Sequence, residues 1–313
     1  MSLRIATVTA NPSVDVCVAV DRVLPQRKLR CGPPRRDPGG GGLNAARVIR
    51  RLGGDPGVIF AAGGDSGQRL QGLVRDEKLT CYVVPIAGDT REDFTADERT
   101  SGDQYRFVLP GPRLTAAESD QLLEAVWTLT PHPDLILASG SLPRGVASGF
   151  YGRLAMRARE AGRRFAVDAS GSALRAALSA GVWMAKPNLA ELEELVGTAL
   201  PTQDQRVAAC QSIVARGRAE VVALTLGAEG ALLVTAGGVW RAPAIDVTVV
   251  SAIGAGDSFM GAFVWAVANA EPLPEAFRWA VAAGAAALTA EGTQLCRAAD
   301  TRRLKQKVCV QRF

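Results

Sequence analysis

The sequence predicts an α/β protein with a doubly wound, mostly parallel sheet that is covered by helices on both faces. Short apolar runs that suit buried strands alternate with helical patterns along most of the 313 residues. This alternation is typical of parallel strands joined by crossover helices. Hydrophobic residues make up 48% of the chain, which is enough for a large core. The length fits one large domain, alone or with a smaller appendage.

The expected elements follow one another in a regular order. Strands are predicted at Arg4–Thr9, Gly57–Phe60, Leu135–Ser139, Phe165–Asp168, Trp183–Ala185 and Val221–Thr225. Helices are predicted at Asn44–Leu52, Gly67–Lys78, Ala116–Thr128, Gly149–Ala161, Ala190–Val196 and Gln203–Ala215.

Two extended segments without helices interrupt this order, at Val14–Val20 and Cys81–Val108. In the second, Ser101–Asp103 is predicted to be the turn of a hairpin. We expect a small antiparallel sheet, made by residues 14–31 and 81–108, that projects from a main α/β domain. That main domain, made by residues 1–13, 32–80 and 109–313, would bind nucleotide and substrate. A small sheet with one apolar face needs cover, so it is expected to act as a lid and to pair with another subunit.

Composition disfavours several classes of protein. The net charge of +5 suits a small anionic substrate, but dispersed arginines and 5% aromatic residues disfavour nucleic-acid binding. No apolar run is long enough for a membrane span, and no signal peptide is visible. Six cysteines without a C-x-x-C pair disfavour a zinc site and fit reduced thiols, so a cytoplasmic location is expected. The one histidine, His132, lies between two prolines, which disfavours histidine-based catalysis.

The stretch "PGGGGLNAARVIRRLGG" (38–54) places four glycines before a helix. They could form a flexible turn, or they could let the backbone approach a ligand at the helix N-terminus. No Gly-Lys-Ser/Thr triplet follows, which excludes a Walker A loop. A dinucleotide fingerprint would open directly after the first strand, whereas about 30 residues separate Thr9 from Gly40, which disfavours a dehydrogenase.

Two further stretches each have a structural and a functional interpretation. Asp257 follows Gly254–Gly256 and precedes an apolar helix to Ala268. Taken alone this favours a capping or first-turn role in the helix, and the alternative is a base beside an anion hole of backbone N–H groups. In "KPNLAELEEL", Asn188 and Glu191 fit a capping box, and the alternative is that they hold water around Mg²⁺. The stretch "LTLGAEGALL" (224–233) predicts only a hairpin.

The order of these motifs is more specific than any one of them. The motifs are "NPSVD", "GGGGLN", "SGSLP", "KPNLAE", "TLGAEG" and "GAGD". In this order the chain resembles, over nearly its whole length, the ribokinase-like (PfkB) carbohydrate kinases. Within the family, "KLRC", "PGGGGLNAAR", "SGDQYRFVLPG" and "GTQLC" look most like the bacterial minor-type 6-phosphofructokinase branch. "TANPSVD" is equally similar to the tagatose-6-phosphate kinase and 1-phosphofructokinase branches.

The resemblance implies a ribokinase-like fold with a β-sheet lid, often dimeric through the lids, and use of ATP and Mg²⁺. The implied reaction is phosphorylation of the 1-hydroxyl of fructose 6-phosphate to fructose 1,6-bisphosphate. Alternatives are a tagatose-6-phosphate kinase, a 1-phosphofructokinase, or a non-catalytic sugar-phosphate-binding regulator. Asp257, Asn188 and Glu191 together argue against the regulator, since a pure binder needs no base.

The resemblance also assigns roles to residues. Asp257 would be the catalytic base, and Gly254, Ala255 and Gly256 would form the anion hole. The nucleotide would contact Lys186, Asn188, Thr225, Gly227 and Gly230, with Mg²⁺ at Asn188 and Glu191 through water. Sugar hydroxyls would bind Asp15, Gly40, Gly41, Gly42, Asn44 and Ser141, and the sugar phosphate would bind Lys28, Arg91 and Arg106. A K⁺ site would lie near Ser251 and Gly292, where Ala252 replaces the threonine usual in the family.

Overall fold

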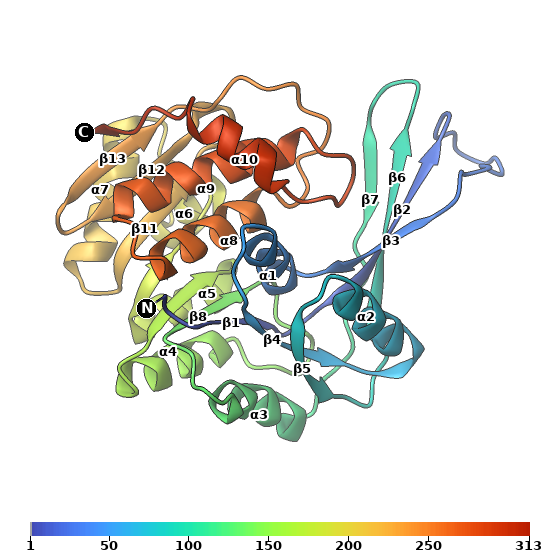
Figure 1. Cartoon of the computed structure of the whole chain (residues 1–313), viewed down its shortest axis with the longest axis horizontal. Coiled ribbons are helices and arrows are strands. Elements are labelled where there is room, and N and C mark those ends of the chain that lie inside the picture. Colours follow the sequence, from blue (N-terminus) through green and yellow to red (C-terminus); the bar gives the residue numbers. More distant parts are fainter. Residues whose placement is uncertain (1) are drawn as a thin grey trace.

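The computed structural model describes residues 2–313 and contains a ten-stranded sheet beside a four-stranded one (Figure 1). From edge to edge, the large sheet contains β14 (Gln311–Arg312), β13 (Gly238–Ala242), β12 (Ala231–Thr235), β11 (Ala219–Thr225), β10 (Val182–Ala185), β9 (Arg164–Asp168), β8 (Leu135–Ser139), β1 (Ile5–Thr9), β4 (Gly57–Ala62) and β5 (Thr80–Pro85). The strands from β5 to β11 are parallel, and β12 to β14 continue the sheet antiparallel. The predicted fold class is confirmed.

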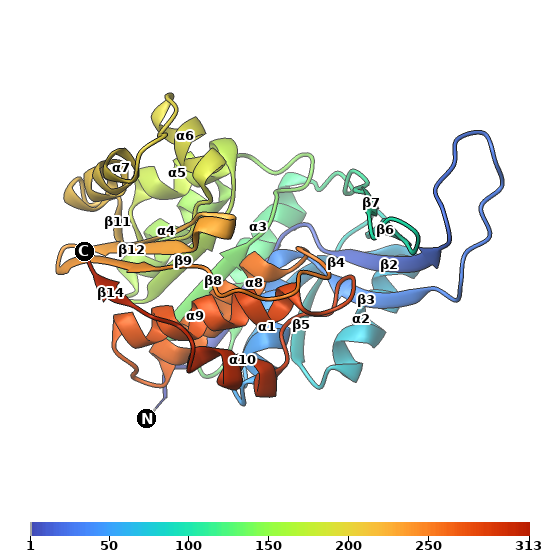
Figure 2. The same cartoon turned by 90° about the horizontal axis from the view of Figure 1, so that it is seen from above.

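Helices cover both faces of the large sheet (Figure 2). They are α1 (Gly41–Arg51), α2 (Gly64–Asp76), α3 (Ala116–Ala125), α4 (Phe150–Glu160), α5 (Gly171–Ala180), α6 (Leu189–Val196), α7 (Gln203–Ala215), α8 (Ala255–Ala268), α9 (Leu273–Leu288) and α10 (Ala298–Lys305). Single 3₁₀ turns occur at Val126–Thr128 and Gly227–Glu229. The two largest cores lie under α3 to α7 and under α1, α8, α9 and α10. A smaller core lies between α1, α2 and β4.

The central strands supply both cores because successive strand residues point to opposite faces. In β8, Ile136 and Ala138 belong to the first core, whereas Leu135 and Leu137 belong to the second. A strand buried on both sides can therefore be apolar throughout, which is why these runs were recognisable in the sequence. Within residues 2–313, no helix combines the length and apolar character needed to cross a bilayer.

The small sheet has the order β3 (Arg35–Gly39), β2 (Ser13–Val20), β6 (Arg91–Glu98) and β7 (Gln104–Phe107). It differs from the prediction in three ways. It is mixed, because β2 and β6 run parallel, and the chain between them passes through the large sheet. Strand β5, expected in the lid, pairs with β4 because β4, α2 and β5 form a parallel crossover unit. Residues 35–39, expected in the main domain, instead form an edge strand of the small sheet.

The two faces of the small sheet differ in polarity. Register places Asp15 beside Asp93, and Thr95 beside Arg106, on one face. The opposite face carries Glu92 and Glu98 of β6 together with apolar residues, among them Phe94, paired with Phe107. Their ring centroids lie 6.1 Å apart, and both rings remain exposed, at 37% and 55% of their surface. The polar face therefore borders the site described next, while the apolar face is only partly covered.

Candidate active site between the two sheets

Helix α8 begins with a loop that leaves Asp257 free of a capping role. Gly254 is the N-cap residue, in the left-handed region at φ 76°. The first hydrogen bond of the helix runs from the Ser258 N–H to the Gly254 carbonyl, at 2.8 Å. The N–H groups of Ala255, Gly256 and Asp257 therefore have no partner in the helix and can bind an anion. Because Asp257 is the third helical residue, it is not the N-cap, but it does occupy the first turn, as the structural interpretation allowed.

The carboxylate of Asp257 contacts helix α1 instead. Its Oδ2 accepts a hydrogen bond from Nδ2 of Asn44, at 2.9 Å, and the residue stays partly accessible. Burial of the carboxyl and the nearby charge of Asp168 raise its pKa to about 6, although the Asn44 bond and Lys186 oppose that shift. A carboxylate with this pKa is mostly unprotonated at neutral pH and can accept a proton.

The glycine loop approaches Asp257 closely. Gly40 adopts φ +108°, a conformation that side chains rarely allow. A Cβ placed on Gly41 would lie 2.1 Å from Oγ of Ser139 and 3.1 Å from Oδ1 of Asp257. The loop is therefore a wall of the site that only glycine can form, which supports the functional interpretation of these glycines.

Three aspartates lie in register across the small sheet. Asp15 of β2 pairs with Asp37 of β3 on one side and with Asp93 of β6 on the other. Like charges in such positions repel. Asp37 is paired with Arg35 and Asp93 with Arg91, whereas among the described residues no ion pair reaches Asp15. Burial raises the pKa of Asp15, and a hydrogen bond from Ser13 opposes this. Asp15 is thus the member of the row best placed to bind a neutral hydroxyl.

The cations expected for a sugar phosphate lie in different places. Arg91 donates to the carbonyl oxygens of Asn11 and Leu109, each at 3.2 Å, beside Asp93. Arg106 is exposed on the polar face of β7. Lys28 lies on the exposed loop that extends past β2 and β3 (Figure 2), and the structure does not bring it to this cluster.

Sequence reasoning missed Asn11, which follows β1 at the carboxyl edge of the large sheet. Its Nδ2 donates to Oγ of Ser141 at 3.1 Å, while its buried Oδ1 has no partner among the described residues. The indication available in the sequence was the position of Asn11 just after the first predicted strand. Ligands of parallel sheets bind beyond the carboxyl ends of the strands.

A cavity of about 320 Å³ adjoins the start of α8. Thr225, Gly227 and Gly230, predicted to contact nucleotide, line it together with apolar side chains such as Ile245, Phe259 and Leu288. An apolar pocket with a polar entrance suits a flat heterocyclic base with a charged tail. The contribution of α9 to this cavity was not foreseen.

Lys186 and Asp168 form an ion pair of 3.1 Å beside the start of α8. Burial is the largest influence on the pKa of Lys186 and lowers it. The charge and hydrogen bond of Asp168, together with the charges of Glu191 and Asp257, outweigh burial, so the pKa is raised and the side chain is cationic. A Cβ on Gly256 would lie 3.5 Å from Nζ, so the cation lies near the free N–H groups of α8. Asp168 was not foreseen, since β9 and β10 meet only in the folded sheet.

Asn188 and Glu191 form the reciprocal capping box of α6. The Asn188 N–H donates to Oε2 of Glu191 at 2.8 Å, and the Glu191 N–H donates to Oδ1 of Asn188 at 2.9 Å. Burial raises the pKa of Glu191. In residues 2–313 no group of three or more acidic, histidine or cysteine side chains could enclose a metal ion. Asn188 and Glu191 therefore fit Mg²⁺ only if the ion keeps water and phosphate ligands, which is how proteins usually bind it.

Comparison with known proteins decides the family. The pfkB family carbohydrate kinase profile matches residues 8–300. The chain belongs to this family. It is 43% identical over 300 residues to the ATP-dependent 6-phosphofructokinase isozyme 2 of Mycobacterium tuberculosis H37Rv, covering 96% of this chain and 88% of that protein. It is 40% identical to the isozyme 2 of Escherichia coli K12, covering 96% and 98%.

A 1-phosphofructokinase of Bacillus subtilis is 31% identical over 287 residues, covering 92% of this chain and 93% of that protein. The crystal structure of E. coli phosphofructokinase-2 in complex with potassium superposes with a TM-score of 0.93, at 39% identity, covering 97% of this kinase and 99% of that chain. The resemblance drawn from the motif order is thereby confirmed.

In this PfkB kinase, Ser251 joins two loops beside α8. Its Oγ donates to the Gly292 carbonyl and contacts Oε1 of Gln104, both at 3.0 Å. Arg35 donates to the neighbouring carbonyl of Glu291 at 3.3 Å. A carbonyl oxygen has two lone pairs, so these carbonyls can still accept a monovalent cation without the threonine that Ala252 replaces.

Proposed function

We propose that this kinase is a 6-phosphofructokinase, which transfers the γ-phosphoryl group of ATP to the 1-hydroxyl of fructose 6-phosphate. The observation that carries the proposal is the position of Asp257. It follows Ala255 and Gly256, which line the cavity and have free N–H groups, and it is close enough to Asp15 of the aspartate row for that charge to influence its pKa. The names of the 6-phosphofructokinase relatives support the choice of sugar phosphate.

In the reaction, Asp257 accepts the proton of the sugar hydroxyl while the new oxygen–phosphorus bond forms. The bond between the γ-phosphorus and the bridging oxygen breaks, and ADP leaves. The N–H groups of Ala255 and Gly256 and the ammonium of Lys186 stabilise negative charge on the phosphoryl group. Asp168 holds that ammonium in place.

The sugar phosphate would span the gap between the two sheets. Asp15, Asn44 and Ser141 would bind its hydroxyls, together with backbone groups of Gly40–Gly42. Arg91 and Arg106 supply positive charge next to Asp15 for the phosphate. Lys28 would reach the phosphate only through a rearrangement of its loop or from another subunit.

Asn188 and Glu191, with Asp168, would hold Mg²⁺ through water. Mg²⁺ supplies charge neutralisation on the nucleotide phosphates. We further propose K⁺ at the carbonyl groups near Ser251 and Gly292, supported by the potassium named for the E. coli structure.

We also propose a homodimer that buries the apolar face of the small sheet. Phe94, Tyr105 and Phe107 are exposed there at 37%, 37% and 55%, and Val108 and Leu109 continue the patch at 57% and 50%. A second copy offers the same apolar face, so a two-fold interface would cover both.

A 1-phosphofructokinase is the second candidate, because relatives of that name are also similar to the chain. Release of ADP would be measured with fructose 6-phosphate, fructose 1-phosphate and tagatose 6-phosphate under identical conditions. The highest kcat/KM with fructose 6-phosphate would support the proposal. Preference for either other sugar would overturn the choice of substrate, and absence of ADP release with all three would overturn the proposed reaction.

A further inference from the structure

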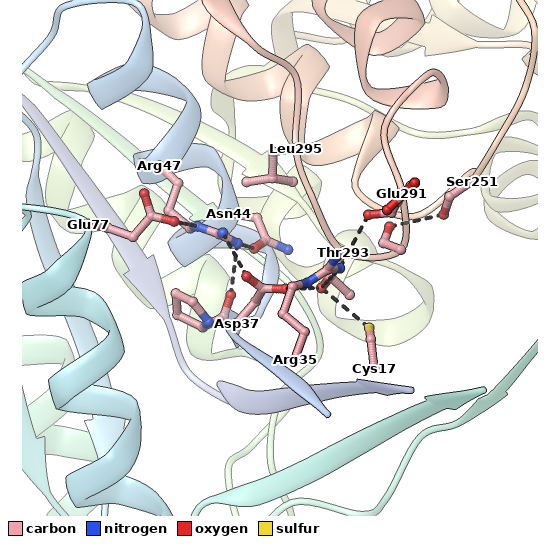
Figure 3. A network of polar contacts seen from close by, with 12 residues as sticks. Cys17, Arg35, Asp37, Asn44, Arg47, Glu77, Ser251, Glu291, Thr293 and Leu295 are labelled. Carbon is pink, nitrogen blue, oxygen red and sulfur yellow. Dashed lines mark hydrogen bonds and ion pairs between the residues drawn. The ribbon is translucent and has the colours of Figure 1, made fainter. Parts of the chain in front are cut away.

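Arg47 is a charged side chain buried at the inner face of α1, with 2% of its surface exposed. A buried cation is costly unless its donors are paired. Its Nε donates to Oε1 of Glu77 at 2.7 Å, and Nη1 donates to the Pro38 carbonyl at 3.2 Å. Nη2 lies 3.5 Å from Oδ1 of Asp37. The guanidinium is therefore fixed from several directions (Figure 3).

The same guanidinium contacts Asn44, three residues earlier on the same face of α1. Nη1 of Arg47 donates to Oδ1 of Asn44 at 3.3 Å. On its other side, Nδ2 of Asn44 donates to Oδ2 of Asp257 at 2.9 Å. The amide thus links a buried cation to the carboxylate in the site.

The chemistry of the two neighbours allows the Asn44 amide one orientation. A guanidinium only donates hydrogen bonds and an ionised carboxylate only accepts them. With the amide turned over, its NH₂ would face the guanidinium and its oxygen would face Asp257, so both contacts would be repulsive. The oxygen must face Arg47 and the nitrogen must face Asp257.

We propose that Arg47 is a positioning residue for phosphoryl transfer, which holds the Asn44 amide so that it donates to the carboxylate of Asp257. The inference rests on the proposed function of Asp257 as the base. A hydrogen bond donated to a carboxylate favours its charged form. Arg47 thereby keeps the base unprotonated toward lower pH and fixes the direction of its oxygen atoms.

The arrangement also couples the small sheet to the base. Asp37 and Pro38 belong to β3, and Asp37 is held in turn by Arg35 and Thr293. Because Arg47 contacts both β3 and Asn44, the position of the small sheet relative to α1 affects the group that orients the base.

Other charged groups near Asp257 make no direct contact with Arg47 in residues 2–313. These groups are Asp168, Lys186 and Asp15, which influence the pKa of Asp257. The charged groups around Arg47 are Asp37, Glu77 and Arg51. An effect of Arg47 on the base can therefore pass through Asn44 or act directly at long range. It can also pass through Asp37, whose register partner Asp15 influences the pKa of Asp257. An experiment can separate the Asn44 route from the two purely electrostatic ones.

The test is the pH dependence of kcat for Arg47→Met, with Arg50→Met as the matched control. Arg50 lies on the same helix, 39% exposed, in an ion pair with Asp55. The acid limb of the pH profile is the pH range in which kcat falls as Asp257 is protonated. If Arg47→Met weakens the hydrogen bond from Asn44 to Asp257, the acid limb should move up by about one pH unit, since a hydrogen bond to a charged group is worth that much. Arg50→Met should leave the limb unchanged. An unmoved limb in folded Arg47→Met overturns the inference.

Combining Arg47→Met with Asn44→Ala tests whether the effect of Arg47 passes through Asn44. In Asn44→Ala, the acid limb should already be raised, and adding Arg47→Met should raise it no further. If the double variant shows the full additional shift, Arg47 acts electrostatically, directly or through Asp37 and Asp15, and the positioning role is wrong.

Two further variants cover misfolding and failure of the base assignment. If Arg47→Met does not fold, Arg47→Lys keeps the charge between Glu77 and Asp37 but lacks the fork that also reaches Asn44. Its acid limb should move in the same direction, and an unmoved limb would contradict the inference.

If Asp257→Asn keeps its turnover, the proposed function fails. If that variant is inactive while the Arg47 limb is unmoved, only the inference fails.

Discussion

The large and small sheets solve the same problem, the burial of an apolar face, in different ways. In the large sheet, Ile136 and Met184 are wholly buried under helices that belong to the same chain. The outer part of the small sheet has a core of only Val18, Val20 and Ala96, with Val23 at its edge. Its two paired phenylalanines remain open.

This difference indicates a division of roles. The proposed base, the free N–H groups and the proposed nucleotide cavity all belong to the self-contained unit, where side chains are fixed by packing. The small sheet would contribute Asp15 and the cations for a sugar phosphate. Because its own core is small, binding of a partner subunit or of substrate would change its stability. Changes in the first unit should therefore alter chemistry, and changes in the second should alter assembly and sugar binding.

The largest effect is expected for Asp257→Asn. Asparagine has nearly the same shape but cannot accept the proton, and general-base catalysis contributes about 10²–10⁴-fold. We expect kcat to fall by at least that lower amount. The melting temperature should change little, because the N-cap of α8 is Gly254. Retention of more than about half of the wild-type kcat would exclude Asp257 as the base, given that magnitude.

The second effect concerns assembly and tests the small sheet. Phe107→Ser removes an exposed aromatic ring from the proposed dimer interface. A central aromatic residue contributes about 2 kcal/mol to such an interface, so the dimer dissociation constant should rise about 30-fold. Sedimentation over a range of concentrations measures it. The exposed Met156 of α4, on the large unit, supplies the control Met156→Ser. A wild type that is monomeric at micromolar concentration and fully active would contradict the dimer.

The site could be predicted from the sequence where local spacing determines it. The glycine loop, the start of α8 and the capping box lie within a few residues each, so their motifs are legible. The row of Asp37, Asp15 and Asp93 could not be predicted, because it depends on the register between strands that are far apart in the chain. The boundaries of the small sheet failed for the same reason: an extended segment such as β5 does not show in its own residues which sheet it joins.

The pH dependence of the wild-type enzyme should reflect the raised pKa of Asp257. The base acts only when unprotonated, so kcat should be constant above the pKa of about 6 and fall as pH decreases through it. Well below that pKa the decrease approaches about tenfold per pH unit. A steady-state profile with saturating substrates measures this. A kcat that stays level down to pH 4 would conflict with the assignment of Asp257.

Arg106→Ala should alter sugar binding without altering chemistry. A charge-assisted hydrogen bond contributes about 1.5–3 kcal/mol, so the KM for fructose 6-phosphate should rise about tenfold. The KM for ATP should change little. Arg99→Ala is the control, since Arg99 is an exposed arginine of the same sheet region paired with Asp21. Equal KM values in wild type and Arg106→Ala would place the sugar phosphate elsewhere.

The smallest effect is expected at two capping boxes of the large unit, one beside the site and one away from it. Asn188 with Glu191 caps α6 beside Lys186, and Thr202 with Gln205 caps α7 on the outside. Loss of an N-cap side chain costs about 0.5–2 kcal/mol of stability, so Asn188→Ala and Thr202→Ala should lower the free energy of unfolding similarly. If Asn188 also holds Mg²⁺ through water, only Asn188→Ala should raise the Mg²⁺ concentration needed for half-maximal activity. Denaturant unfolding and Mg²⁺ titration of both variants compare the two. If Asn188→Ala leaves the Mg²⁺ requirement unchanged, Asn188 only caps its helix, as Thr202 does, and the proposed contact with Mg²⁺ is wrong.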